Sequence, residues 1–363
     1  MKIVLEHLTK KFISRNNKNE IVTAVNDFDF EIPDGKLIGL LGPSGCGKST
    51  TLNLICGLEE PTSGKIYFGD LDVTGLPPEN RGVGMVFQNY ALYPHLTVRQ
   101  NIRFPLENLK GADKLSKEVI EQRALEAAKL VQIDTLMDRK PNELSGGQQQ
   151  RVPIARALVK TPGVLLLDEP LSNLDARLRL QTREQIRRIQ KETGVTTIFV
   201  THDQEEAMSI SDYIIVMKAG VLQQMGEPQK VYNEPVNLFV AQFLGNPAIN
   251  VFNGQIRDHG LYIGEDRISD FDAEDQEVYV GVRPEAFIPD EKGPFRCVFD
   301  RVETTGRDTS IVTHNENCIS DEDIRAIVSA DEKLNNENGI IRFSLKPAKV
   351  HVFSKEDEKV IHG

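Results

Sequence analysis

The stretch "GPSGCGKST", residues 42–50, constrains the fold of this chain more than any other. It follows the strand-like run "KLIGLL" and precedes the apolar run "TLNLICGL", which is the strand, loop, helix order that a phosphate-binding loop requires. The glycines let the backbone turn its N–H groups toward an anion, and the positive end of the next helix faces the same point. We therefore expect Lys48 to reach the β and γ phosphates of a nucleotide and Ser49 to ligate Mg²⁺. A glycine-rich turn that occurs by chance is the alternative, and the full pattern in this context disfavours it.

Further apolar runs predict a parallel sheet behind this loop. "GVGMVF", "GVLLLDEP" and "TTIFVTHD" are short, continuously apolar and bounded by turn residues, as strands covered on both faces are. Residues 115–133 have helical spacing, so a helical insert separates the second and third strand groups. We expect an α/β domain over residues 1–235, with a parallel-rich sheet and a helical subdomain at about residues 89–155.

The predicted strands end in polar side chains. Asp168 and Glu169 close one strand, Gln88 follows another, and His202 follows a third. Because the carboxyl ends of parallel strands meet at one edge of a sheet, where ligands bind, we expect these groups to lie near the phosphate loop. There Asp168 would hold Mg²⁺ through water, Glu169 would orient or deprotonate an attacking water, and Gln88 would complete the metal coordination or position that water. Each residue alone could be an ordinary surface group, but these three strand ends, together with the one that delivers Lys48 and Ser49, favour a site.

The distribution of apolar and turn residues along the sequence changes near residue 236. A chain of 363 residues exceeds what one core usually holds, and short apolar runs broken by Gly, Asp and Asn predict a small antiparallel barrel or sandwich over residues 236–363. This part carries most of the net charge of −11, which argues against nucleic acid as a partner. The four cysteines lack CxxC or Cys/His spacing, so we expect neither a zinc site nor a disulfide framework.

We expect the chain to stay in the cytoplasm. No apolar run approaches the roughly 20 residues that a membrane-spanning helix needs. The start "MKIVLEHLTKKF" has neither a long apolar core nor a small-residue cleavage site.

These motifs occur in the order found in the ATPase subunit of ABC (ATP-binding cassette) transporters, which the chain resembles over nearly its whole length. "GPSGCGKST" resembles Walker A, "VLLLDEP" Walker B, "LSGGQ" the family signature and "SNLDA" the D-loop, with Gln88 at the Q-loop and His202 as the switch histidine. The resemblance implies a P-loop NTPase fold that uses ATP and Mg²⁺. It implies the catalytic residues Lys48, Glu169 and His202, and the metal ligands Ser49, Gln88 and Asp168.

The resemblance also implies the residues that hold ATP. In such proteins adenine stacks on an aromatic shortly after the first strand, and Phe12 is the best match, although core packing is its competing role. The full implied set comprises the Walker A loop, the Q-loop glutamine and this aromatic: Phe12, Gly42, Pro43, Ser44, Gly45, Cys46, Gly47, Lys48, Ser49, Thr50 and Gln88.

In this family two cassettes meet head to tail, and the signature of one closes on the nucleotide held by the other. Ser145, the amides of Gly146 and Gly147, Gln148 and a helix N-terminus would form the anion site that acts in trans. Asp175 belongs to the implied D-loop. A single cassette in the chain implies a second from an identical subunit, hence a two-fold symmetric homodimer.

The signature segment "LSGGQQQRVPIARAL", residues 144–158, departs from the family pattern at a proline. With Ser145 as the cap, Pro153 is well inside the helix, where it removes the hydrogen bond to the Gln149 carbonyl and costs about 3 kcal/mol or bends the helix. Three explanations stay open: a tolerated kink, an altered coupling of the helical insert, or an inactivating or erroneous residue. We favour the tolerated kink, since the phosphate contacts lie on the first turn.

The C-terminal part narrows the subfamily. "VGVRPEAF" and "FSLKPAKVHVFSKEDEKVI" resemble the OB/TOBE-like barrel of sugar-importer (MalK-like) ATPases, a regulatory or dimerisation domain that could bind a cytoplasmic regulator. Residues Tyr90–Leu96 resemble the segment where two integral-membrane permease subunits dock, although they could merely pack the helical insert.

The implied function is an ATPase, peripheral on the cytoplasmic side of the membrane, whose closure as a homodimer powers import of a sugar or oligosaccharide delivered by an extracellular solute-binding protein. Importers of polyamine, glycerol phosphate, sulfate or iron use similar ATPases and are the alternative. A soluble ABC ATPase in translation or repair is more remote, because such proteins usually carry paired cassettes, or coiled-coil or zinc insertions that this chain lacks.

Overall fold

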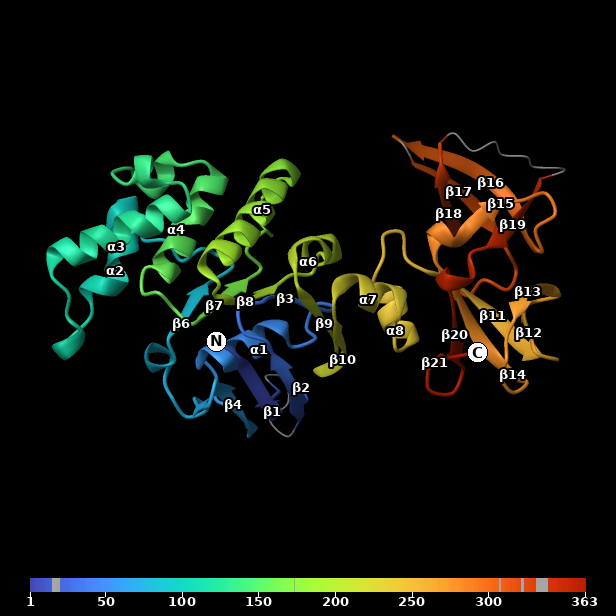
Figure 1. The fold of residues 1–363 in the computed structure, drawn as a ribbon, viewed down its shortest axis with the longest axis horizontal. Helices are drawn as coiled ribbons and strands as arrows, with labels where there is room; N and C mark the ends of the chain where they lie inside the picture. The colour runs from blue at the N-terminus through green and yellow to red at the C-terminus, as the bar shows by residue number, and fades with distance from the viewer. Residues whose placement is uncertain (15–19, 173, 307, 321–322, 331–338) are drawn as a thin grey trace. The chain divides into compact units, whose positions relative to one another are not determined.

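The computed structural model describes residues 1–14, 20–172, 174–306, 308–320, 323–330 and 339–363, and it divides into two compact units, Met1–Pro228 and Gln229–Gly363 (Figure 1). The boundary lies slightly before the expected residue 236. The difference arises because two short helices, α7 (Pro228–Asn233) and α8 (Leu238–Phe243), are held by the second unit. The predicted fold class, an α/β cassette followed by an all-β barrel, is confirmed.

The first unit contains the predicted parallel-rich sheet. Its order is β10-β9-β3-β8-β7-β6, and every pair is parallel except β9 with β10. All residues of β3 and β8 are buried, as expected for strands covered on both faces. The strands are β3 (Leu37–Leu41), β6 (Val83–Val86), β7 (Val164–Asp168), β8 (Thr196–Val200), β9 (Tyr213–Lys218) and β10 (Val221–Gly226); the helices beside them are α1 (Lys48–Cys56), α5 (Ala176–Thr193) and α6 (Gln204–Ile210).

A second, antiparallel sheet in this unit was not predicted. It has the order β2-β1-β4-β5, with β1 (Ile3–Ile13), β2 (Ile21–Ile32), β4 (Ser63–Phe68) and β5 (Leu71–Asp72). Three register shifts interrupt the pairing of β1 with β2, so the inward and outward side chains do not alternate regularly. Apolar and polar residues therefore do not alternate regularly in this part of the sequence, although such alternation is the pattern by which these strands are usually predicted.

The helical insert is formed by α2 (Val98–Glu107), α3 (Lys117–Leu130) and α4 (Gly146–Leu158), which pack against one another and appear teal to green in Figure 1. The helix expected within residues 115–133 is confirmed as α3. A capping box starts α2: the Gln100 N–H donates to the Thr97 hydroxyl, and the Thr97 N–H donates to the Gln100 side chain. Among the described residues, no helix is long and apolar enough to cross a bilayer.

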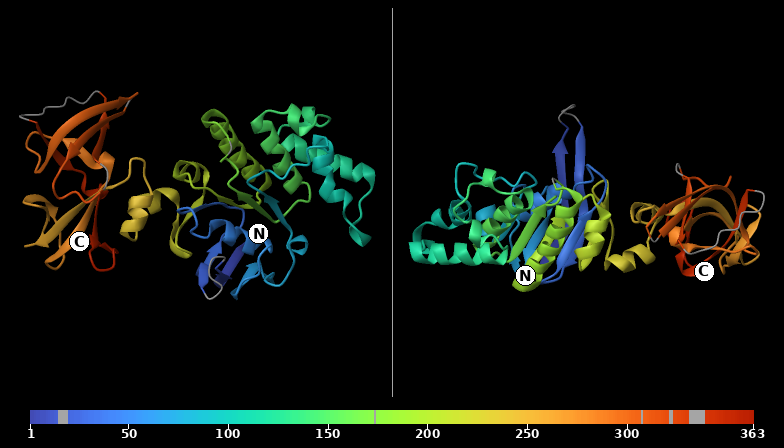
Figure 2. Two further views of the ribbon diagram at one scale, coloured as in Figure 1. Left: turned by 180° about the vertical axis from the view of Figure 1, so that it is seen from behind. Right: turned by 90° about the horizontal axis from the view of Figure 1, so that it is seen from above.

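The second unit is a nearly closed antiparallel barrel, seen end-on at the right of Figure 2. Its sheets have the orders β13-β12-β11-β14-β20-β21 and β15-β19-β16-β17-β18. Phe252, Phe287, Phe295 and Phe343 join both sheets in one core. The strands are β11 (Asn250–Arg257), β12 (Gly260–Ile263), β13 (Asp266–Asp270), β14 (Gln276–Val282), β15 (Phe287–Pro289), β16 (Phe295–Thr305), β17 (Asp308–His314), β18 (Ile324–Ser329), β19 (Ile340–Leu345), β20 (Val350–Ser354) and β21 (Val360–Ile361).

A fully buried cation attaches the two short helices to this barrel. The Arg283 guanidinium donates to the carbonyls of Tyr232 at 2.8 Å, of Ala241 at 2.9 Å and of Leu244. It also lies 3.9 Å from the centre of the Tyr232 ring. These carbonyls lie in or near the last turns of α7 and α8, where the helix dipoles favour a positive charge. The cation therefore explains why both helices belong to the second unit.

His351, in β20, makes the stability of the second unit sensitive to pH. Burial, followed by the charges of Arg283 and Lys349, lowers its pKa to about 4 from the ordinary 6.5, with Glu285 opposing the shift. Because the unfolded chain takes up the proton first, stability falls as pH drops from about 6.5 to about 4, by up to about 3 kcal/mol. Hydrogen exchange of β20 across this range should show the loss. His351→Phe should reduce this dependence of stability on pH, whereas His362→Phe, at an exposed position, should not. An unchanged dependence on pH in His351→Phe would contradict the role of His351.

Helix α4 continues through Pro153 without a break. Pro153 is buried, so the packing of its ring offsets part of the stability that a proline inside a helix costs. A second proline, Pro105, lies inside α2 but is only half-buried.

We expect Pro153→Ala to raise the melting temperature by a few degrees. Restoring the helical hydrogen bond gains about 3 kcal/mol, and losing two buried methylenes costs about 1.6 kcal/mol, which leaves a gain of about 1 kcal/mol. Pro105→Ala should stabilise more, because less burial is lost. ATP affinity should change little in Pro153→Ala. Calorimetry of both variants checks this, and a lower melting temperature for Pro153→Ala would contradict it.

Candidate functional site

The phosphate loop is confined so closely that two of its positions require glycine. At Gly47 φ is +103°, and an added Cβ would lie 2.1 Å from the carbonyl oxygen of Ala24. At Gly42 a Cβ would lie 2.5 Å from both the Cys46 sulfur and the Met217 carbonyl oxygen. The loop therefore lies directly on the backbone of neighbouring segments, and α1 begins where it ends.

Lys48 lies on the inner side of this loop. Its side chain is buried, and its ammonium donates to the carbonyls of Gly42 at 2.7 Å and Pro43 at 3.0 Å. Burial raises the pKa of the nearby Cys46 thiol, with the Lys48 charge opposing that shift. The loop thus holds one cation beside the N-terminus of α1 and keeps its cysteine in the neutral form near pH 7.

A second buried cation fixes the other end of α1. Arg81 donates to the carbonyls of Leu54 at 2.7 Å and Ile55 at 3.1 Å, both in the last turn of the helix. It also donates to Leu76 and Thr74 in the preceding loop. The guanidinium donates hydrogen bonds to carbonyls at the end of the helix and interacts favourably with the negative end of the dipole. The helix behind the phosphate loop is therefore anchored at both ends.

The sheet brings the predicted strand-end residues to one edge, because β3, β8, β7 and β6 are consecutive neighbours. The Ser49 hydroxyl donates to Asp168 Oδ1 at 3.0 Å. Burial raises the pKa of Asp168, while the Ser49 hydrogen bond and the Lys48 charge oppose that shift. Hydroxyl and carboxylate oxygens are hard donors of the kind that Mg²⁺ uses together with phosphate and water, so this pair fits the expected metal.

Glu169 joins two of the other strand ends. Its Oε2 accepts a hydrogen bond from Gln88 Nε2 at 2.9 Å and lies 3.6 Å from His202 Nδ1. The backbone of Glu169 is left-handed, with φ +44°, and its N–H donates to the Val200 carbonyl at 3.1 Å. Such a conformation is uncommon for a residue other than glycine and persists only where the surroundings hold it. The carboxylate is consequently placed between an amide and an imidazole by a strained turn.

The surroundings of His202 contain charged groups that sequence analysis did not single out. Glu206 is buried and accepts from the Thr201 hydroxyl at 2.6 Å; burial raises its pKa. Arg179, from α5, lies 3.5 Å from Glu206 and 3.6 Å from Asp203. Glu206 follows the histidine in "THDQEEA", but a glutamate in a helical segment gives no sign in the sequence that it will be buried.

The signature residues begin helix α4. Gln148 accepts from the Ser145 N–H at 3.0 Å, Ser145 and Gly146 are exposed, and Gly147 is buried. One turn further, the buried Gln150 donates to the Pro170 carbonyl, which follows Glu169 directly. Helix α4 is thus attached to the end of β7 by a residue that the motif "LSGGQ" does not include.

Asp175, the predicted D-loop residue, caps α5 and accepts from the Leu178 N–H at 3.0 Å. Residue 173 of the same loop lies outside the described residues. Phe12 is half-buried on β1, with the Lys10 ammonium 4.7 Å from its ring centre, and it does not belong to the buried core of this unit. Of the segment Tyr90–Leu96, Ala91, Pro94 and His95 are exposed and the remaining residues are half-buried.

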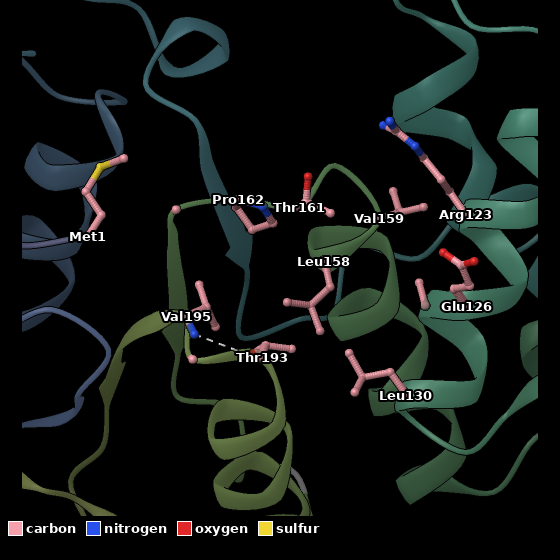
Figure 3. A pocket seen from close by; sticks show the side chains of 13 residues that line it. Met1, Arg123, Glu126, Leu130, Leu158, Val159, Thr161, Pro162, Thr193 and Val195 are labelled. Carbon is pink, nitrogen blue, oxygen red and sulfur yellow. Dashed lines mark hydrogen bonds between the residues drawn. The ribbon is translucent and has the colours of Figure 1, made fainter.

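A cavity of about 600 Å³ lies at the other end of the sheet (Figure 3). It is lined by Gly163 and Val195, just before β7 and β8, and by Leu130 and Leu158 of the helical insert. The site residues are instead at the carboxyl ends of these strands, which is where ligands of open α/β sheets bind. This cavity is therefore separate from the strand-end cluster.

Comparisons with known proteins agree with this geometry. The family model described as ABC transporter matches residues 25–172. A trehalose/maltose import ATP-binding protein of Thermococcus litoralis is 42% identical, with 94% of this chain and 96% of that protein covered. A sn-glycerol-3-phosphate import ATP-binding protein of Jannaschia sp. is 41% identical, over 92% of this chain and 93% of that protein.

A solved structure shares the fold of the first unit. The ATP-binding cassette MJ0796, in a dimeric post-hydrolysis state bound to ADP and Pi, has a TM-score of 0.54 and 35% identity, covering 62% of this chain and 98% of that one. The order of the motifs, the strand-end cluster and the near full-length relatives lead to one conclusion. This chain belongs to the ATP-binding subunits of the ABC transporter family.

Proposed function

We propose that the chain is the ATP-hydrolysing subunit of an ABC importer. The observation that carries the proposal is the strand-end cluster, in which Ser49 contacts Asp168 while Gln88 and His202 flank Glu169 beside the phosphate loop. These are the groups needed to bind a metal–nucleotide complex and to place a water against its terminal phosphate. The near full-length import ATP-binding relatives support the transport role.

In the proposed cycle the loop binds ATP first. The backbone amides around Gly45 and Gly47 and the N-terminus of α1 receive the phosphates, and the Lys48 ammonium exchanges a loop carbonyl for a phosphate oxygen. Ser49, Asp168 and Gln88 would hold Mg²⁺, which supplies positive charge to the β and γ phosphates when bound. The half-buried Phe12 ring would stack on the adenine.

Hydrolysis then depends on Glu169. Its carboxylate orients the attacking water and accepts the water's proton, and Gln88 and His202 fix the carboxylate from two sides. His202 is also placed to stabilise charge that develops on the terminal phosphate, together with Lys48. Phosphoryl transfer to water requires little covalent chemistry from the protein. The rate enhancement therefore comes mainly from positioning of the reacting groups and from stabilisation of charge.

A second copy of the chain completes the site. The exposed N-terminus of α4, with Ser145 and Gly146, forms an anion site that no nucleotide in its own subunit needs. We assign it to the γ-phosphate held by the partner of a homodimer, with Asp175 of each D-loop beside the shared interface. The dimeric relative supports this arrangement.

The solute is proposed to be a sugar or oligosaccharide, with two permease subunits docking at Tyr90–Leu96 on the cytoplasmic side of the membrane. Relatives named for trehalose/maltose and for sn-glycerol-3-phosphate import support a carbohydrate-like solute and keep glycerol phosphate as the alternative. In the reconstituted importer with its solute-binding protein, stimulation of ATP hydrolysis by maltose or trehalose but not by glycerol phosphate would distinguish them.

We expect Gly47→Ala to weaken ATP binding by about tenfold or more, because the added Cβ would lie 2.1 Å from the Ala24 carbonyl and must displace the loop. Gly69→Ala is the matched control: φ is +59° there as well, but no atom lies within 4 Å of the added Cβ. The control should lose roughly 1 kcal/mol of stability and no ATP affinity. Titration with a fluorescent ATP analogue checks both, and unchanged affinity in Gly47→Ala would contradict the assigned loop.

Glu169→Gln should retain ATP-dependent dimerisation and lose turnover by roughly 10²-fold to 10⁴-fold, because the amide keeps the shape of the side chain but cannot accept a proton. Steady-state phosphate release and size-exclusion chromatography with ATP measure the two properties. Glu205→Gln, at an exposed position in the first turn of α6, should behave as wild type. Normal turnover in Glu169→Gln would remove this residue from the mechanism.

A further inference from the structure

Arg156 connects the signature helix to the docking segment Tyr90–Leu96. It is near the C-terminal end of α4, and its guanidinium donates to two successive carbonyls, Ala91 at 2.7 Å and Tyr90 at 3.0 Å. The same guanidinium lies 5.4 Å from the centre of the Tyr93 ring. A planar cation with several donors in a fixed geometry is suited to holding two neighbouring acceptors at once.

The backbone that Arg156 holds is strained. Tyr90 and Ala91 are both left-handed, with φ +61° and +44°, although neither is glycine. Successive left-handed residues cost energy and persist only where contacts over-determine them. Two charge-assisted hydrogen bonds from the half-buried Arg156 supply such contacts, because a bond to a charged donor is stronger than a neutral one.

The other half of the segment is held from α2. The fully buried Asn101 accepts from the Tyr93 N–H at 2.9 Å and donates to the carbonyls of Tyr93, Leu96 and Thr97 at 3.0–3.2 Å. The Tyr93 ring also packs on Phe104 of α2, with ring centres 4.7 Å apart. The segment is therefore attached to α2 through Asn101 and to α4 through Arg156.

Helix α4 has the signature residues at one end and Arg156 at the other. The ten-residue rise from Gly146 to Arg156 corresponds to about 15 Å. Between them Gln150 is attached to the end of β7, and Pro153 is buried. A displacement of the first turn is consequently carried along one packed element to the carbonyls of Tyr90 and Ala91.

We propose that Arg156 is a positioning residue that clamps the docking segment to the signature helix, so that closure of the signature on nucleotide moves the segment that faces the permease. The proposal rests on the proposed function, in which the α4 N-terminus binds the partner's γ-phosphate. It adds a named side chain to that function: without Arg156 the signature can still engage ATP, but the docking segment no longer follows it.

Hydrogen exchange of the backbone over residues 88–97 tests the clamp in the full-length chain. In the Glu169→Gln background, ATP-dependent dimerisation should slow exchange there. Adding Arg156→Met should raise exchange in the ATP-free chain by about tenfold or more and abolish the further slowing by ATP, while dimerisation persists. Arg156→Lys, which keeps the charge but cannot hold both carbonyls equally, should give an intermediate result and serves if Arg156→Met does not fold.

Arg151→Met is the matched control, since Arg151 is on the same helix and faces the Gln132 carbonyl at 3.5 Å rather than the docking segment. It should leave exchange at residues 88–97 unchanged. Wild-type exchange in Arg156→Met or Arg156→Lys, or an equal loss in Arg151→Met, would overturn the clamp. Failure of the wild type to hydrolyse ATP, or of Glu169→Gln to dimerise with ATP, would instead count against the proposed function, and the ATP-free comparison would still decide on the clamp.

Discussion

The parallel pairing of β3, β8, β7 and β6 is the constraint on which the rest of the site depends. Because these strands run in one direction, their carboxyl ends deliver the phosphate loop, His202, Asp168 and Gln88 to a single edge. The chemistry is then set by short contacts between side chains that are far apart in the sequence, such as Ser49 with Asp168 at 3.0 Å. Long-range pairing of backbone, rather than any one motif, creates the proximity.

Cations that donate to backbone carbonyls hold the elements around this edge. Arg81 anchors the C-terminus of α1, Lys48 lies inside the phosphate loop, and Arg156 holds the backbone of the segment Tyr90–Leu96. In the second unit Arg283 attaches α7 and α8 to the barrel in the same manner. In each case the hydrogen-bond acceptors are carbonyl oxygens, many of them at helix ends, where the helix dipole favours a positive charge.

In the proposed transport cycle, helix α4 transmits movement from the signature residues to the segment Tyr90–Leu96. Its first turn presents the signature, Gln150 contacts the segment that follows Glu169, and Arg156 contacts the segment Tyr90–Leu96. The proline that looked incompatible with a helix is buried in this packed element. Pro153 removes the helical hydrogen bond to the Gln149 carbonyl. Neither the first turn of α4 nor Arg156 depends on that bond.

The phosphate loop, the parallel strands, the strand-end residues and the barrel class of the second unit could be predicted from the sequence, because each depends on local spacing of glycine, apolar and turn residues. It could not reveal the antiparallel sheet of β1 and β2, whose register shifts erase the alternation, or the burial of Glu206 and Asn101, which look like ordinary helix-surface residues. Nor could it assign Arg156, since a cation near a helix end gives no sign of which carbonyls it will meet. These features depend on the three-dimensional fold, because hydrogen bonds between distant segments form only where the sheet and the helical insert bring those segments together.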